Sequence, residues 1–89
     1  MTTITTEPTY YNNKIFIING RKYYDLDRID TIEKTGAGKW EGTMNQVPFM
    51  ICGGKEAGGY AHEWFAQYND ERVFRCNNAV AALTFIANT

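Results

Sequence analysis

The sequence contains few of the side chains from which metal and cofactor sites are usually built. It holds one histidine, His62, and two cysteines, Cys52 and Cys76. A structural zinc site normally takes four such ligands, with cysteines in closely spaced pairs, and neither cysteine here has a near partner. We therefore expect no metal and no cofactor. We also expect the cysteines to be buried free thiols rather than a disulfide.

The residues needed for nucleophilic catalysis are equally sparse. A Cys52 nucleophile with His62 as its base would need a third group to orient the imidazole, and Glu63 points away from His62 if both lie in a strand. The segment TGAGKW at 35–40 lacks the spacing of a phosphate-binding loop. An anion cradle in the glycine-rich stretch 53–59 is a less favoured alternative to a plain loop. The chain is predicted not to be an enzyme.

No excess of charge of one sign is present. Nine Lys and Arg stand against ten Asp and Glu, and the basic residues are interleaved with acidic ones. Non-specific binding of a polyphosphate depends on a clustered positive surface, so nucleic acid is the less favoured partner. A long apolar run and a secretory signal are also missing, which predicts no membrane association and a cytoplasmic protein.

With 44% hydrophobic and 21% charged residues, the composition is typical of a globular domain. Residues 1–12 are rich in Thr and Asn and lack a sustained period, so they are expected to form a flexible arm, with an edge strand at 9–11 as an alternative. Residues 13–89 are expected to form one domain.

Two segments, KIFII and RKYYDL, flank the dipeptide Asn19-Gly20, which readily adopts the positive φ angles of a type I′ turn. This pattern predicts a hairpin. Both faces of the strand KIFII are apolar, with Ile15 and Ile17 on one and Phe16 and Ile18 on the other. This is typical of a central strand that is covered on both faces. The next segment, 26–34, fits either a short helix or a bulged strand, and the branched residues favour the strand.

Further strands are predicted for KWEGTM, VPFMIC, HEWFAQY and ERVFRC, separated by turns at 36–38, 45–46 and 69–70 and by the glycine-rich loop 53–61. The chain ends in NNAVAALTFIANT, where Asn77 or Asn78 can cap an Ala-rich helix. A helical wheel places Leu83 and Ile86 in its apolar sector and Phe85 outside it. The predicted fold is α+β: an antiparallel sheet of about five or six strands with one C-terminal helix packed on it.

Aromatic residues make up 15% of the chain, which is more than so small a core needs. Tyr and other aromatic residues carry much of the binding energy in interfaces. We therefore select Tyr60 in the glycine loop, Phe85 outside the helix core sector and Tyr11 in the arm as candidate binding residues. Asp27 and Asp30, from the one acidic run, are candidates for contacting a basic partner surface.

These features together favour a non-enzymatic protein-binding module. A small inhibitor or regulator of a host protein complex, of the kind that bacteriophages encode, fits the size and the neutral charge. Two alternatives apply to Phe85: it fills a groove at the edge of the sheet, or it joins two copies of the chain into a symmetric dimer. The second hypothesis is a small nucleic-acid-binding domain that uses sheet aromatics and a local basic face.

Overall fold

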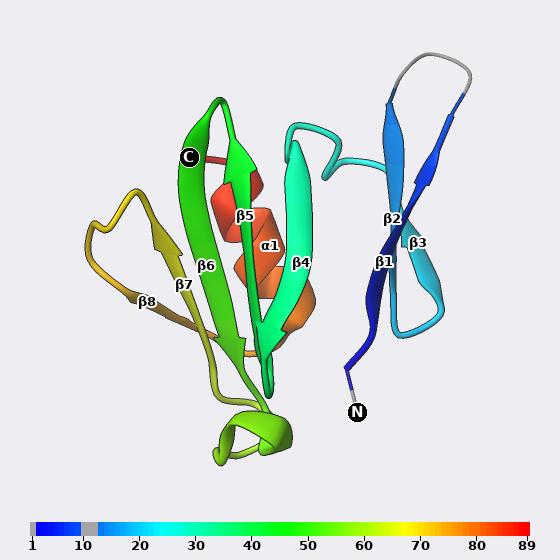
Figure 1. Cartoon of the computed structure of the whole chain (residues 1–89). Helices are drawn as coiled ribbons and strands as arrows, with labels where there is room; N and C mark the ends of the chain where they lie inside the picture. The colour runs from blue at the N-terminus through cyan, green and yellow to red at the C-terminus, as the bar shows by residue number, and fades with distance from the viewer. Residues whose placement is uncertain (1, 10–12) are drawn as a thin grey trace.

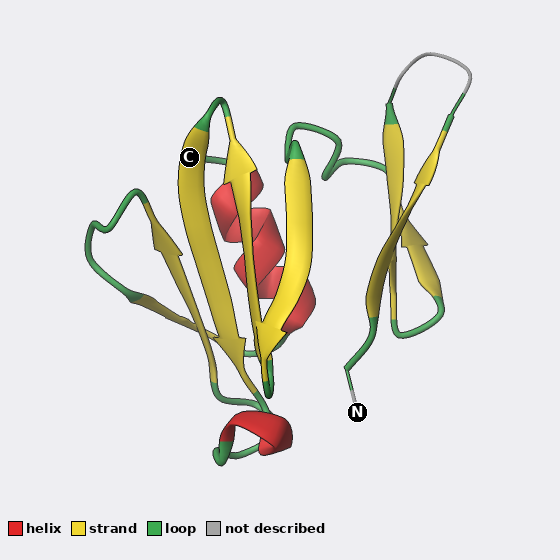
Figure 2. Ribbon diagram, viewed as in Figure 1, coloured by secondary structure: helices red, strands yellow, loops and turns green. Residues whose placement is uncertain are grey.

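The structure is a computed structural model that describes residues 2–9 and 13–89. In these residues it contains two antiparallel sheets, one α-helix and one short 3-10 helix (Figures 1 and 2). The helix packs on the larger sheet, so the α+β prediction is confirmed. The strands divide into a three-stranded small sheet and a five-stranded large sheet, a division that the sequence analysis did not foresee.

The small sheet consists of β1 (Ile4–Pro8), β2 (Lys14–Ile18) and β3 (Arg21–Tyr23), with β2 in the centre. Asn19 and Gly20 have φ angles of 52° and 83°, which is the paired positive conformation of a type I′ turn. The predicted hairpin between β2 and β3 is therefore confirmed.

Strand β1 lies within the segment that the sequence analysis assigned to a flexible arm. Its residues pair antiparallel with β2, from Ile4 opposite Ile18 to Pro8 opposite Lys14. The alternative edge strand at 9–11 is not where pairing is seen: Thr9 follows β1, and Tyr11 lies outside the described residues.

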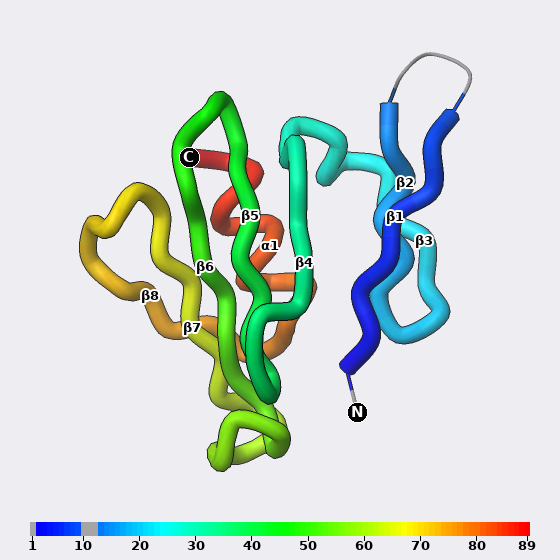
Figure 3. Tube along the Cα trace, in the orientation of Figure 1, coloured from blue at the N-terminus to red at the C-terminus, as the bar shows by residue number. Residues whose placement is uncertain are grey.

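The large sheet is a meander in which each strand pairs with the next along the chain (Figure 3). It contains β4 (Thr31–Gly36), β5 (Lys39–Met44), β6 (Val47–Gly53), β7 (Trp64–Tyr68) and β8 (Phe74–Cys76). The turns at 45–46 and 69–70 both have paired positive φ angles, as expected for tight hairpins. Strand β8 is shorter than the predicted ERVFRC, because only its last three residues pair with β7.

The ambiguous segment 26–34 divides into a turn and a strand. Residues 25–28 form the turn, and the Ile29 amide donates a hydrogen bond to the Leu26 carbonyl at 3.1 Å. Strand β4 then begins at Thr31 and has a register shift between Lys34 and Gly36. The bulged strand that the sequence favoured is thus found in the second half of the segment. Leu26, in the turn, and Ile29, directly after it, are both buried in the core.

Helix α1 (Ala79–Ala87) lies behind the large sheet in the view of Figure 1, packed on β6, β7 and β8. Asn78 is the N-cap, and its side-chain oxygen accepts a hydrogen bond from the Ala81 amide at 2.7 Å. Leu83 and Ile86 are fully buried, as predicted. Within the described residues, no helix is long and apolar enough to cross a membrane.

Both sheets contribute to one hydrophobic core. Phe16 and Ile18 of the small sheet belong to the same buried cluster as Phe49 and Ile51 of the large sheet. Polar contacts between distant segments support this arrangement: Arg28 donates to the carbonyl of Ala87 at 2.6 Å, and Lys14 to that of Ile29 at 2.9 Å. The small sheet is therefore packed into the domain rather than attached to it as a loose arm.

Candidate functional site

The candidate binding residues chosen from the sequence lie at separate places in the fold. Tyr60 is in the loop that follows the lower end of β6 in Figure 1, beside the 3-10 helix η1 (Lys55–Ala57). Asp30 is at the opposite end of the large sheet, where its Oδ2 accepts a hydrogen bond from the Asn45 amide at 3.0 Å. Asp27 is exposed in the turn before β4, and Tyr11 lies outside the described residues. Among the described candidates, Tyr60 therefore does not share a patch with Asp27 and Asp30.

Tyr60 is the most exposed of the large hydrophobic residues that the structure describes, with 70% of its surface accessible. Its ring is stacked on the His62 ring, with centroids 5.7 Å apart. The loop is held locally, because the Tyr60 amide donates to Glu63 Oε1 at 3.1 Å. Tyr60 can therefore contact a partner, as the sequence suggested.

Phe85 is half-buried, because its ring packs against Phe74 with centroids 4.5 Å apart. The Arg72 guanidinium lies over the other ring, 4.7 Å from the Phe74 centroid. Phe85 thus covers the edge of the core beside β8, which is the structural role that the helical wheel did not assign to it. This contact with Phe74 explains why a large apolar side chain lies outside the core sector of the helix, and no binding partner is needed to explain it.

One side of the large sheet, opposite α1, is not covered by other described segments, and we call it the open face. The strand register places eleven side chains on it: Thr31, Glu33, Lys39, Glu41, Thr43, Pro48, Met50, Cys52, Phe65, Gln67 and Arg75. It is turned toward the viewer in Figure 1, and no other described segment crosses it there. None of its eleven residues was among the binding residues predicted from the sequence.

The centre of the open face is apolar. Met50 and Phe65 are half-buried by their neighbours in the sheet, yet neither belongs to the hydrophobic core nor packs against it. A hollow of about 150 Å³ lies beside Met50 and is bordered by Pro48 and Gln67. The alternation in VPFMIC, which is apolar on both sides, was the signal in the sequence that could have revealed this face.

Charged residues of both signs flank the apolar residues of the open face. Glu33 and Glu41 are directly opposite each other on β4 and β5. Lys39 and Arg75 lie at the two ends of the next cross-strand row. The Arg75 guanidinium forms an ion pair with the Glu63 carboxylate at 3.9 Å. The Arg75 side chain is 64% exposed.

The two cysteines lie on opposite sides of the large sheet. Cys52 pairs with Phe65 and so lies on the open face, whereas Cys76 pairs with the buried Trp64 and lies on the helix side. Both are free thiols, as predicted, but they are half-buried rather than fully buried. Burial raises the pKa of Cys52, an effect that Lys39 partly offsets, and burial also raises the pKa of Cys76. A raised pKa disfavours the nucleophilic thiolate.

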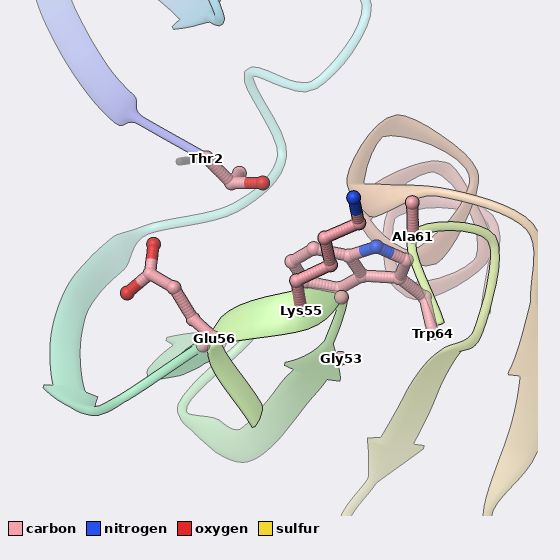
Figure 4. Close-up of a pocket in the computed structure, with 8 residues that line it drawn as sticks. Thr2, Gly53, Lys55, Glu56, Ala61 and Trp64 are labelled. Atoms are coloured by element: carbon pink, nitrogen blue, oxygen red, sulfur yellow. The ribbon is translucent and has the colours of Figure 1, made fainter. Parts of the chain in front are cut away.

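A cavity of about 170 Å³ lies between the glycine loop and Thr2, with the Trp64 indole, Lys55 and Glu56 at its walls (Figure 4). The amides of Gly53 and Gly54 donate to the carbonyls of Gly38 and Glu63, so they are not free to bind an anion. A hydrogen bond from Lys34, at 2.8 Å, holds the pKa of Glu56 below its usual range. The charged carboxylate further disfavours the anion cradle considered from the sequence.

In the part of the chain that the structure describes, no group of three or more His, Cys, Asp or Glu side chains is arranged to hold a metal ion. Comparison with known proteins found no matching family, no similar curated protein and no similar solved structure.

Proposed function

We propose that the chain is a non-enzymatic protein-binding module that binds its partner through the open face of the large sheet. The observation that carries this proposal is an uncovered sheet face with Met50 and Phe65 at its centre and charges of both signs around them. An apolar centre surrounded by a polar rim is the usual anatomy of a protein interface.

Phe65 is the one aromatic residue among the eleven side chains of the open face. It lies on β7, with Cys52 on one side and Arg75 on the other. Aromatic and arginine side chains supply most of the binding energy in many interfaces. Phe65 is expected to be the residue whose loss weakens binding most.

The partner that fits this surface presents an apolar patch with a basic group opposite Glu33 and Glu41 and an acidic group opposite Lys39. Such matching of charges sets the orientation of the complex and the rate of association more than its affinity. A small regulator or inhibitor of a protein complex is a function that this kind of surface can perform.

Capture from a lysate of the native cell tests the proposal when it is done with matched variants. We expect the wild-type protein to retain a partner that Phe65→Ser loses and Val73→Ser retains. Val73 is 46% exposed in the loop before β8, outside the paired residues that carry the open face, so it is the control. Equal capture by Phe65→Ser, with an unchanged melting temperature, would show that the open face is not the binding surface.

One observation favours the second candidate, binding of single-stranded nucleic acid. Lys39, Phe65 and Arg75 lie in one cross-strand row, and an aromatic ring between two cations is a combination on which a base can stack. Glu33 and Glu41 lie in the neighbouring row and disfavour nucleic-acid binding, because their carboxylates repel phosphates. The protein-binding proposal expects no binding of a fluorescent oligonucleotide at physiological salt. Salt-sensitive binding that Phe65→Ser and Lys39→Gln both weaken would favour the nucleic-acid function instead.

A further inference from the structure

The small sheet has a second uncovered face, on the side that points away from the core. Phe16, Ile18 and Tyr23 face the core, and the register therefore places the alternate residues on the opposite side. This outer face carries Thr5, Glu7, Ile15, Ile17 and Lys22, with the exposed Tyr24 directly after β3.

The outer face is apolar along its middle. Ile15 and Ile17 lie on the central strand β2, and neither belongs to the core nor packs against it. Tyr24 is 66% exposed beside them. A strand with apolar residues on both sides is typical of a sheet that is covered on both faces, and the described chain covers only the inner one.

The charges on the outer face are arranged diagonally. Glu7 lies opposite Ile15 on β1, and Lys22 lies opposite Ile17 on β3, so the acid and the base stand at opposite corners of the isoleucine pair. A twofold axis parallel to the sheet would place Glu7 of one copy over Lys22 of another, twice in the same interface. Symmetric dimers require this kind of self-complementary patch.

We propose that the outer face of the small sheet binds a second copy of this chain, with the isoleucines in contact and two Glu7–Lys22 pairs beside them. The proposal is independent of the open face, which lies on the other sheet. Stable interfaces bury about 800 Å² per partner, more than one face of a three-stranded sheet provides. We therefore expect a reversible dimer that forms at micromolar or higher concentration.

Sedimentation equilibrium between about 10 µM and 1 mM tests this proposal, a range that spans weak protein association. The wild-type mass should rise from 10.2 kDa toward twice that value. Glu7→Lys and Lys22→Glu should each raise the dissociation constant roughly tenfold, because each change turns two attractions into two repulsions. The double variant Glu7→Lys/Lys22→Glu should restore it. Both substituted positions are exposed, so the fold of all three variants is expected to persist, and circular dichroism checks it.

Glu41→Lys is the matched control, because it reverses one exposed charge on the open face instead. It should leave the dissociation constant unchanged. A mass that stays at 10.2 kDa over the whole range would overturn the proposal. So would a double variant that associates no better than either single one, or an association that Glu41→Lys abolishes.

Discussion

Met50 and Phe65 point to the opposite side of the sheet from their apolar sequence neighbours Phe49 and Trp64. Phe49 and Trp64 are 3% exposed in the core, whereas Met50 and Phe65 remain accessible on the open face. Successive residues of a strand face opposite sides, so adjacent apolar residues have different roles. Substitutions at 49 and 64 should therefore reduce stability, and those at 50 and 65 should reduce binding.

Asn78 contributes to stability through a single hydrogen bond. Its side chain accepts from the Ala81 amide, which would otherwise have no partner at the start of α1. Asn78→Ala should lower the free energy of unfolding by about 0.5–2 kcal/mol, measured by urea denaturation. Asn77→Ala is the control and should change stability by less than about 0.5 kcal/mol, because Asn77 is exposed and outside the helix. Equal losses in both variants would contradict the assignment of the cap.

Cys52 should react slowly with iodoacetamide in the folded protein. The thiolate is the reactive form, and burial raises the pKa of Cys52, so less thiolate is present near neutral pH than in an unfolded chain. The same shift stabilises the fold below the usual thiol pKa, and this contribution is lost as the pH rises through the raised value. We expect labelling to accelerate when the protein is unfolded in urea. Labelling that is faster in the folded state than in urea would show that Cys52 is activated.

At the scale of secondary structure, local sequence patterns predicted individual strands, turns and the helix better than they predicted how these elements pair and pack. The Asn19-Gly20 turn and the helix cap depend on neighbouring residues alone: the turn was predicted from the sequence, and the cap was narrowed to Asn77 or Asn78. The pairing of β1 with β2 depends on contacts that Ile4 makes with residues far along the chain, and no period in residues 1–12 signals it. The position of Phe85 against Phe74 depends on where β8 begins, which the run ERVFRC does not specify.

The end of β6 depends on glycine for close packing. A Cβ at Gly53, where φ is 152°, would lie 2.3 Å from the Glu63 carbonyl oxygen and 2.6 Å from the Trp64 Cα. These are backbone atoms, so the strand must move to relieve the clash. Gly53→Ala should therefore lower the free energy of unfolding by more than about 2 kcal/mol, as judged from typical costs of strained backbone and overpacking.

Gly58→Ala is the matched control for that change. Gly58 has a φ of 88°, but no atom lies within 4 Å of a Cβ built there. Only the left-handed conformation opposes an alanine, at a cost of about 1–2 kcal/mol. If thermal and urea denaturation show the two variants to be equally stable, close packing is not the reason for glycine at position 53.

At the scale of the whole molecule, two sheets share one core, and each has one side that the described residues leave uncovered. The sequence signals only one strand of the open face, through the alternation in VPFMIC, because its other members come from four further strands and share no local motif. The candidates that were selected, Tyr60 and Phe85, were chosen as aromatic residues outside the predicted core. The structure shows that Tyr60 is indeed exposed, whereas Phe85 packs beside the core.

The most direct test of the account is the affinity of the open face for a purified, captured partner, measured by isothermal titration calorimetry. Wild-type protein and Val73→Ser should bind with the same dissociation constant. Phe65→Ser should bind at least roughly tenfold more weakly, equivalent to about 1.4 kcal/mol, because it removes the one aromatic side chain of the open face. If Phe65→Ser keeps the wild-type melting temperature and binds the partner with undiminished affinity, the open face is not the surface through which this protein acts.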